Sequence, residues 1–444
     1  MKRMALLLLP LLASALITPA LPAPSSARPS FVTVKNHKFY IGDKPYYYIG
    51  TNYWYGSLLG LENDKKRGVE RLRRELDFLK ANGVTNLRLM AGAEGSGMIN
   101  GVLRVGPPLQ PRPGEFNEDV LKGLDLILSE MGKRDLKAVI FFSNNWEWSG
   151  GFQQYLTWHN QVPEALRTRK LTWDEQRDIV SKFYGCAPCK ENYNRQVSLL
   201  LDRTNKHNKR KYTEDPTIMA WELANEPRPM RPAAADAYKQ WIANVAAMIK
   251  AKDKNHLVTL GHEGEMGTED LKLFEEIHAD PNVDYLTIHI WPKNWSWFTG
   301  HQVEEGFPKV IENTLSYIDR HVEIAKRLNK PLVIEEFGLP RDKHSFEVSA
   351  LTSQRDAFYR QIFSIIEKQP ATDGHIAGAN FWAFGGISRP VKGQTFWKEG
   401  DYYMGDPPME EQGLNSVFDI DKSTWEIIRA ASQSLAKSSG KATN

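Results

Sequence analysis

The sequence predicts a (β/α)8 barrel, because eight short apolar segments alternate with amphipathic ones along the chain. The apolar segments carry hydrophobic residues at consecutive positions, as strands do when both of their faces are buried. An open doubly wound sheet is the alternative α/β fold, but no glycine-rich nucleotide-binding sequence follows the first strand. The expected strands are 46–52, 86–90, 137–143, 218–222, 257–261, 285–290, 331–336 and 376–381.

The remaining elements follow in order from local patterns. Turn residues at Asn36-His37 and Gly42-Asp43 predict a short β-hairpin before the first barrel strand. Apolar residues at helical spacing predict helices between the strands, and a long insertion follows the third strand at 150–212. The expected helices are 69–79, 120–134, 238–250, 271–278, 311–322, 349–366 and 424–436.

The composition is that of one large globular domain with little net charge. Hydrophobic residues make up 41% and charged residues 25% of the 444 positions, which excludes a collagen-like, coiled-coil or largely disordered chain. Lys and Arg total 57 against 54 Asp and Glu, so neither nucleic acid nor an anionic membrane is an expected partner. We expect residues 28–444 to form a single domain and the protein to be a monomer.

The first 27 residues have the pattern of a secretory signal peptide. Two basic residues, Lys2 and Arg3, precede an apolar run at 5–17, and small residues with prolines follow, which predicts cleavage between residues 20 and 27. The apolar run is too short to cross a bilayer, which needs roughly 20 residues. We therefore expect an exported protein, extracellular or, in a Gram-negative bacterium, periplasmic.

The chain contains two cysteines, Cys186 and Cys189. A structural zinc site needs about four ligands, and a thioredoxin-like redox pair needs a βαβ unit that the neighbouring sequence does not supply. In an oxidising compartment a local disulfide is the expected state, with free thiols or a redox role as the alternatives. We expect neither a metal ion nor a cofactor.

Two glutamates stand at the ends of expected strands, where the catalytic groups of a barrel gather. Glu226 follows the fourth strand in the sequence Asn-Glu-Pro-Arg, and Glu336 ends the seventh strand in Glu-Glu-Phe-Gly. An isolated glutamate is usually a solvated loop acid or part of a structural ion pair. Two carboxyls at the same end of one barrel can instead hydrolyse a glycosidic bond, one as proton donor and the other as nucleophile.

The ordered set of motifs around these glutamates resembles glycoside hydrolase family 5, and within it the β-mannanase subgroup. The resemblance spans residues 31–436 and implies the (β/α)8 fold of that family. The matching stretches are Gly50-Thr51-Asn52-Tyr53-Trp54, Asn86-Leu87-Arg88-Leu89, Asn144-Asn145-Trp146 followed by Gly150-Gly151, Asn225-Glu226-Pro227-Arg228, Glu336-Phe337-Gly338 and Phe381-Trp382.

This resemblance implies roles for the residues of a reaction centre. Glu226 would be the general acid/base and Glu336 the nucleophile, while Asn225 would hydrogen-bond the sugar 2-hydroxyl. Arg88 would keep the nucleophile ionised, because a nearby cation lowers the pKa of a carboxylate. Trp382 would form the floor beneath the sugar that is cleaved.

Further substrate-binding residues are implied by the same motifs. His289 matches the histidine of the sixth strand, and two positions later the family usually has a tyrosine that donates to the nucleophile; here Trp291 offers an indole N–H. Glu335, which precedes the nucleophile, would point to the opposite face of its strand. The other residues assigned to substrate binding are Trp54, Asn145, Trp146 and Arg228, with His262, Glu263 and Trp295 as further pocket candidates.

As a whole, the resemblance implies a secreted, retaining endo-β-1,4-mannanase that cuts mannan, glucomannan or galactomannan. An endo-β-1,4-glucanase or an exo-β-mannosidase would use the same chemistry, and the 150–212 insertion could block one end of the cleft and enforce exo action. A carbohydrate-binding barrel without activity is the alternative from another class, but it would not need two facing acids. Thirteen tryptophans and a near-zero net charge suit an uncharged polysaccharide, because aromatic faces stack on sugar rings.

Overall fold

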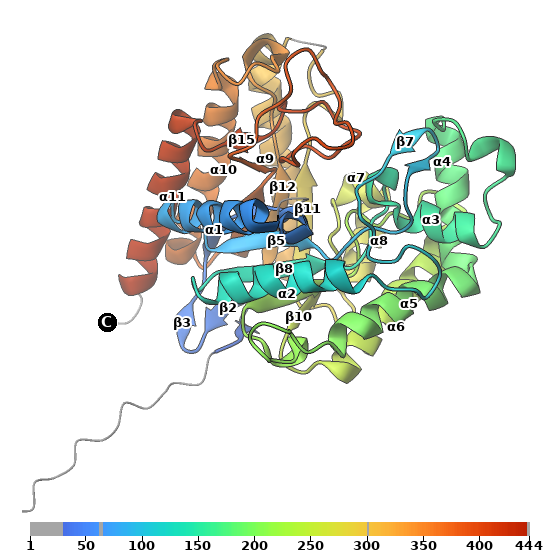
Figure 1. Cartoon of the computed structure of the whole chain (residues 1–444). Helices are drawn as coiled ribbons and strands as arrows, with labels where there is room; N and C mark the ends of the chain where they lie inside the picture. The colour runs from blue at the N-terminus through green and yellow to red at the C-terminus, as the bar shows by residue number, and fades with distance from the viewer. Residues whose placement is uncertain (1–29, 62–64, 300–301, 442–444) are drawn as a thin grey trace, which may run out of the picture. The chain divides into compact units, whose positions relative to one another are not determined.

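Eight parallel strands form the core of the computed structural model, which describes residues 30–61, 65–299 and 302–441 (Figure 1). They pair in the order β10-β9-β8-β5-β4-β13-β12-β11. Their bounds are β4 (Tyr48–Asn52), β5 (Asn86–Met90), β8 (Lys137–Phe141), β9 (Ile218–Glu222), β10 (Leu257–Thr259), β11 (Leu286–Ile290), β12 (Leu332–Phe337) and β13 (Ile376–Phe381).

The two end strands of this order, β10 and β11, meet at the seam of the barrel. There the Asp284 N–H donates to the Val258 carbonyl at 2.8 Å, and the His289 N–H donates to the Glu263 carbonyl at 2.9 Å. The barrel is therefore nearly closed, and the predicted (β/α)8 fold is confirmed. Each expected strand ends within two residues of the observed one, because the apolar run stops where the chain leaves the ladder.

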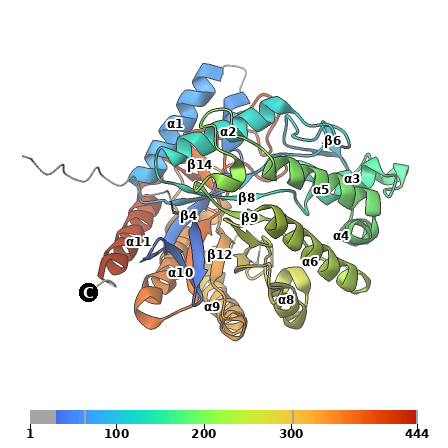
Figure 2. The ribbon, with the colours of Figure 1, turned by 90° about the horizontal axis from the view of Figure 1, so that it is seen from below.

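Helices surround the strands, as Figure 2 shows in the view from below. In the first of them, Leu72, Leu76 and Leu79 fall on one face and are fully buried, and Gly83, with a φ of 82°, follows the helix end. The barrel helices are α1 (Lys65–Ala81), α2 (Glu118–Gly132), α5 (Ala187–Leu201), α6 (Ala235–Lys252), α8 (Leu271–His278), α9 (Val303–Leu328), α10 (Ser353–Thr372) and α11 (Lys422–Lys441).

A three-stranded antiparallel sheet covers one end of the barrel, where the sequence predicted a two-stranded hairpin. Val32 and Phe39 of this sheet pack with Tyr48, Tyr285 and other residues near the starts of the barrel strands. Side chains therefore fill this end, and the functional site is expected at the carboxyl ends of the strands. The three strands are β1 (Val32–Lys35), β2 (Lys38–Ile41) and β3 (Lys44–Pro45).

The insertion after β8 is helical. It carries α3 (Gly151–Trp158) and α4 (Trp173–Val180) before the barrel helix α5, and Figure 1 shows these helices together at one side of the barrel. Cys186 and Cys189 form a disulfide at the start of α5, with their Cα atoms 5.3 Å apart, as the sequence predicted.

A second long segment, 387–416, was not predicted. It lies between two short parallel strands, β14 (Phe384–Gly386) and β15 (Val417–Phe418). Its many glycines, prolines and charged residues give it neither a helical nor a strand period, so no pattern indicated that it is ordered.

The remaining short elements connect these parts. The residues from Phe31 onward form one unit by their contacts, whereas the expected leader at 1–27 lies outside the described residues. None of the helices in the described ranges combines the length and the apolarity that a membrane span requires. The short elements are β6 (Met98–Ile99), β7 (Val102–Leu103), α7 (Glu265–Thr268) and 3-10 helices at Gly56–Leu61, Glu147–Ser149, Glu164–Leu166, Ser181–Gly185, Tyr212–Glu214, Pro232–Ala234 and Asp342–His344.

Candidate active site

A pocket of about 700 Å³ opens at the carboxyl ends of the barrel strands. It collects side chains that lie far apart in the sequence, from the ends of β9 to β13 and from the loop after β8. The residues of the sequence analysis that line it are Trp146, Asn225, Glu226, Arg228, Glu263, Trp291, Trp295, Glu336 and Trp382.

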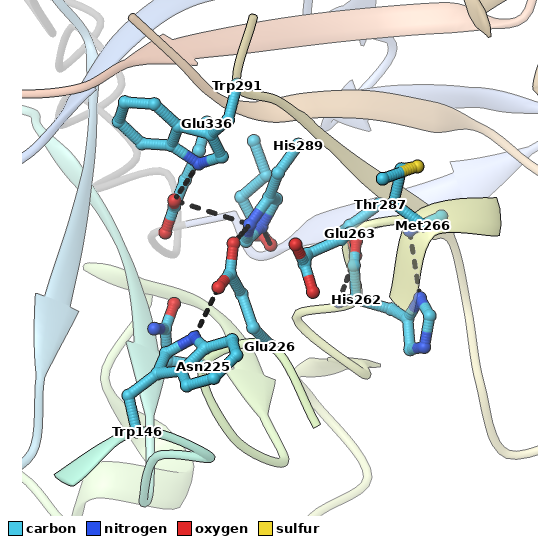
Figure 3. Close-up of polar contacts among 12 residues, drawn as sticks. Trp146, Asn225, Glu226, His262, Glu263, Met266, Thr287, His289, Trp291 and Glu336 are labelled. Atoms are coloured by element: carbon cyan, nitrogen blue, oxygen red, sulfur yellow. Dashed lines mark hydrogen bonds and ion pairs between the residues drawn. The ribbon is translucent and has the colours of Figure 1, made fainter. Parts of the chain in front are cut away.

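Glu226 stands just after β9, where the backbone turns. Its φ of 52° lies in the left-handed region that a non-glycine residue seldom occupies, and its N–H donates to the Gly261 carbonyl at 2.8 Å. The side chain faces the pocket, where the Trp146 indole N–H donates to Oε2 and His289 Nδ1 lies 2.6 Å from Oε1 (Figure 3). Both carboxyl oxygens of Glu226 are thus held by protein groups.

Glu336 belongs to β12 itself. Arg88, on β5, donates through Nη1 to Oε1, and the Trp291 indole N–H donates to Oε2 at 3.1 Å. His289 Nδ1 lies 3.3 Å from the same Oε2. Trp291 therefore donates to Glu336 through its indole nitrogen, at the position where the family usually has a tyrosine.

Glu335 was expected to point away from Glu336, but its carboxylate lies on the same side of the strand. The pairing of β11 with β12 shifts register between Ile288 and His289, so Glu335 is left without a partner residue. Its carboxylate lies 3.7 Å from Arg88 Nε and 3.6 Å from His289 Nε2. The expectation was wrong because this irregularity breaks the alternation of an ideal strand.

The two candidate catalytic carboxyls lie close together. Glu226, Glu336 and His289 each offer an atom within 4.8 Å of the atoms offered by the other two. Carboxyl groups about 5–5.5 Å apart serve retaining glycosidases, whereas inverting enzymes need about 6.5–9.5 Å to admit a water molecule. Among the described residues, these three side chains also form a cluster of potential ligand atoms close enough together to bind a metal ion.

Burial raises the pKa of both Glu226 and Glu336. Arg88 and the Trp291 N–H oppose this increase at Glu336, because both donate to the ionised carboxylate. Burial lowers the pKa of His289 to about 4, so its imidazole is neutral near pH 7. Where the two carboxyls share one proton, we place it on Glu226, because the guanidinium bonds directly to Glu336.

Arg88 is fully buried and is not among the residues that line the pocket. It donates to Glu222 through Nε at 2.9 Å and through Nη2 at 2.5 Å. Nη2 also donates to Asn225 Oδ1 at 2.8 Å, and Nη1 donates to Asn52 Oδ1 at 3.0 Å. Arg88 therefore orients Asn225 and Glu336 and is not itself a contact for substrate.

Arg228 and Glu263 form an ion pair on the pocket wall, with Nη2 2.7 Å from Oε1. The guanidinium also lies over the Trp146 ring, 4.9 Å from its centroid. Asn145, which was assigned to substrate binding, is fully buried, and its Oδ1 accepts from the Arg228 N–H at 3.4 Å. It supports the loop that carries Arg228 and does not line the pocket.

Trp54 was assigned to the pocket, but it is a core residue. Its side chain is 0% exposed, its indole N–H donates to the Gly405 carbonyl at 2.8 Å, and its ring packs against Trp148. The prediction was wrong because the 387–416 segment, which contains Gly405, covers this strand end and was not foreseen.

His262 is also structural. It is fully buried, and its Nδ1 accepts from the Gly264 N–H at 2.9 Å. Figure 3 shows its ring directed away from Glu226 and Glu336, on the far side of Glu263. Of the two neighbouring candidates, only Glu263 reaches the pocket.

Residues from four segments line the pocket without having been predicted: the loop and insertion after β8, the loop after β10, the loop after β11 and the 387–416 segment. Trp173 and Phe396 are 47% and 51% exposed. In the insertion and the 387–416 segment, the lining residues do not stand directly after an apolar strand run. Only the presence of aromatic residues there indicated a binding role. The missed residues are Glu147, Lys170, Trp173, Gln176, Met266, Lys293, Asn294, Phe396, Met409, Glu410, Glu411, Leu414 and Asn415.

Glu410 adds a further carboxyl to the pocket. Burial, reinforced by the nearby Asp406 and Glu226 carboxyls, raises its pKa to about 8. The Glu410 carboxyl is therefore mostly protonated at neutral pH and can donate a hydrogen bond to an uncharged ligand.

Comparison with known proteins agrees with this geometry. Residues 29–440 match the model of glycoside hydrolase family 5 β-mannosidase-like proteins. The crystal structure of a family 5 mannosidase from Rhizomucor miehei is 31% identical with a TM-score of 0.83, covering 94% of this chain and 100% of that one. Mannan endo-1,4-β-mannosidase 7 of Arabidopsis thaliana is 30% identical over 366 residues, 79% of this chain and 77% of that protein. The endo-β-1,4-mannanase of Thermotoga petrophila, 24% identical with a TM-score of 0.63 over 88% of this chain and 77% of that one, shares the fold.

Two carboxyls at the strand ends of a (β/α)8 barrel, together with these matches, define the class: the protein is a glycoside hydrolase. Within that class, the chain belongs to glycoside hydrolase family 5 and to its β-mannosidase-like group.

Proposed function

We propose that this protein hydrolyses β-1,4-mannosidic bonds with retention of configuration, as a mannan endo-1,4-β-mannosidase. The observation that carries the proposal is the separation of the Glu226 and Glu336 carboxylates, which approach within 4.8 Å. The relatives from A. thaliana and R. miehei support mannose as the sugar at the cleavage point.

In the first step, Glu336 attacks the anomeric carbon while Glu226 protonates the oxygen of the leaving sugar. The bond to the leaving sugar breaks, and an ester forms between the remaining sugar and Glu336. Arg88 and Trp291 favour the ionised form of Glu336 that this attack requires. Asn225, held by Arg88, faces the 2-hydroxyl, whose hydrogen bond strengthens in the transition state.

In the second step, a water molecule attacks the same carbon and Glu226 accepts its proton. Formation of the ester has removed the negative charge of Glu336. Because that charge helps to raise the pKa of Glu226, its loss lets Glu226 act as a base. Attack on opposite faces in the two steps restores the original configuration.

The pocket walls suit a neutral substrate. Arg228 is paired with Glu263, so this cation is neutralised within the wall. The rings of Trp291 and Trp382 lie 5.8 Å apart at an interplanar angle of 75°, beside Glu336. Such aromatic faces bind the apolar C–H surface of a sugar without charge.

Exo action is a second candidate, favoured by the 387–416 segment. Lys293 pairs with Glu411, which joins this segment to the loop after β11. A wall at one end of the cleft would admit only the last sugar of a chain. The pocket residues from this segment are Phe396, Met409, Glu410, Glu411, Leu414 and Asn415.

Product analysis on mannohexaose and cellohexaose tests the proposal. Endo action is expected to release several shorter oligosaccharides at early times, whereas release of mannose alone would establish the exo candidate. Cleavage of cellohexaose with intact mannohexaose would reject both. Glu226→Gln and Glu336→Gln are each expected to lower turnover by orders of magnitude with an unchanged circular dichroism spectrum, and near-normal activity in either variant would reject its assigned role.

We also infer that the protein is exported. The pattern of residues 1–27 and the Cys186–Cys189 disulfide support this inference. Amino-terminal sequencing of the protein from the culture medium or periplasm is expected to begin just after residues 20–27. A cytoplasmic protein that retains Met1 would contradict it.

A further inference from the structure

Trp173 is an exposed tryptophan on the pocket wall that has no part in the mechanism above. Its side chain is 47% exposed, although it belongs to a residue type that usually buries most of its surface. An exposed aromatic face beside a pocket is a frequent sign of a binding surface.

The position of Trp173 is fixed by the helix that carries it. Thr172 and Glu175 form a capping box at the start of α4, which makes Trp173 the first residue of the helix. Arg177 of the same helix donates through Nε to the Met230 carbonyl at 2.7 Å. Met230 lies in the loop that begins at Glu226, so this hydrogen bond links α4 to the loop that carries the acid/base.

A second tie comes from the loop after β9. Arg231 Nε donates to Asp178 at 2.7 Å, and its Nη2 donates to Asp174 Oδ1 at 3.0 Å. Both aspartates belong to α4. Although these exposed pairs contribute little stability individually, together they fix the orientation of α4 relative to the pocket.

The ring of Trp173 continues a row that starts at the acid/base. The Trp146 indole donates to Glu226, and the Trp173 ring lies 6.2 Å from the Trp146 ring at an interplanar angle of 30°. The Arg228 guanidinium lies against both rings, 4.9 Å from the centroid of Trp146 and 5.7 Å from that of Trp173. Trp173 is therefore one ring further from the cleavage point than Trp146.

We propose that Trp173 is a platform for a pyranose ring of the leaving part of the substrate, one sugar beyond the sugar next to the scissile bond. The acid/base protonates the leaving oxygen, so a row of rings that runs outward from Glu226 follows the leaving chain. Lys170 and Gln176 line the pocket beside Trp173 and supply donors for sugar hydroxyls. This inference rests on the proposed function.

Reactivation of a trapped intermediate tests the platform directly. The enzyme is first converted to its ester at Glu336 with 2-deoxy-2-fluoro-β-mannosyl fluoride, which releases fluoride. A hydroxyl of an added mannose or mannobiose then attacks the anomeric carbon, its proton passes to Glu226, and the bond to Glu336 breaks. Mannobiose places its second sugar at the proposed platform, whereas mannose does not reach it.

For Trp173→Ala, the half-saturating concentration of mannobiose is expected to rise about five- to tenfold, equivalent to about 1–1.4 kcal/mol. The value for mannose is expected to stay within about twofold of wild type. Trp173→Phe, which keeps an aromatic face, is expected to lie between wild type and the alanine variant. Tyr402→Ala, which removes a 41% exposed ring outside the pocket, is the control and should leave both values unchanged.

Two outcomes would overturn the platform. Equal changes for mannose and mannobiose would indicate a general disturbance of the site, and no change for either would show that no sugar stacks there. Failure of the wild-type enzyme to form the ester would instead contradict the retaining mechanism, so the two failures are distinguishable.

Discussion

Glu335 and Glu336, consecutive residues of β12, both direct their carboxylates towards Arg88. Arg88 also donates two hydrogen bonds to the Glu222 carboxylate, so one buried cation faces three buried carboxyls. Three negative charges around one positive charge cannot all persist in so dry a site. A proton must therefore stay on one of them.

We assign this proton to Glu335. Burial raises its pKa, and the Glu222 carboxylate raises it further. Among the described residues, Glu335 Oε2 has no hydrogen-bond partner, whereas Glu222 and Glu336 are bonded directly to the guanidinium. When Glu335 is neutral, the positive charge of Arg88 is balanced by the carboxylates of Glu222 and Glu336.

Glu335→Gln replaces the neutral acid by a neutral amide of the same shape. We expect kcat/KM to stay within about fivefold of wild type, about 1 kcal/mol, with the acid limb of its pH profile unmoved. Glu222→Gln is the matched contrast, because removing an ionised partner frees Arg88 for Glu336 and shifts the acid limb to lower pH. A downward shift in Glu335→Gln as well would show that Glu335 is ionised.

Trp291→Phe removes the indole N–H that donates to Glu336. A hydrogen bond to the charged form lowers a carboxylate pKa, so its loss raises the pKa of Glu336. Because activity requires the ionised carboxylate, we expect the acid limb of kcat/KM to move up by about one pH unit. Trp295→Phe, at another tryptophan of the pocket, should leave the limb in place, and an unmoved limb in Trp291→Phe would contradict the role of Trp291.

Trp54→Ala tests whether Trp54 belongs to the core and not to the substrate-binding site. Because Trp54 is fully buried, we expect the free energy of unfolding to fall by about 3–5 kcal/mol in urea titrations. The KM for short substrates should not change in the folded fraction. A raised KM with unchanged stability would return Trp54 to the substrate-binding residues.

Glu94 ties the insertion to the barrel. It accepts from the Gly151 N–H at 2.9 Å, from Gln196 Nε2 at 3.1 Å and from the Tyr155 hydroxyl at 3.2 Å. Burial raises its pKa from 4.5 to about 7. The folded protein therefore binds this proton more tightly than the unfolded chain, and stability decreases as pH rises between these values.

Glu94→Gln removes this titration. Relative to the variant, wild type should lose about 3 kcal/mol of unfolding free energy between pH 4.5 and pH 7.5. Urea unfolding at the two pH values measures the difference, independently of any constant effect of the substitution. The same pH dependence in both proteins would contradict the assignment.

The sequence was sufficient for the barrel and the catalytic pair, because both depend on regular patterns. Each barrel strand is an apolar run, and Glu226 and Glu336 stand where such runs end. The motifs then assigned Arg88 and Trp291, whose contacts with Glu336 follow from the barrel register.

The sequence-based predictions were wrong where a residue's position depends on segments that lack a regular hydrophobic pattern. Trp54 follows a strand end as Trp382 does, but the 387–416 segment covers it. Trp173 lies in the insertion, where only tertiary packing places it at the pocket. Glu335 faces Arg88 because of a register shift between two strands that no single-strand pattern contains.

The configuration of the first product tests the central claim most directly. Proton NMR during early hydrolysis of a β-1,4-mannooligosaccharide distinguishes the two anomers before they interconvert. The close approach of Glu226 and Glu336 predicts that the β-anomer appears first and the α-anomer only later, by mutarotation. Initial formation of the α-anomer would contradict a double displacement at this site.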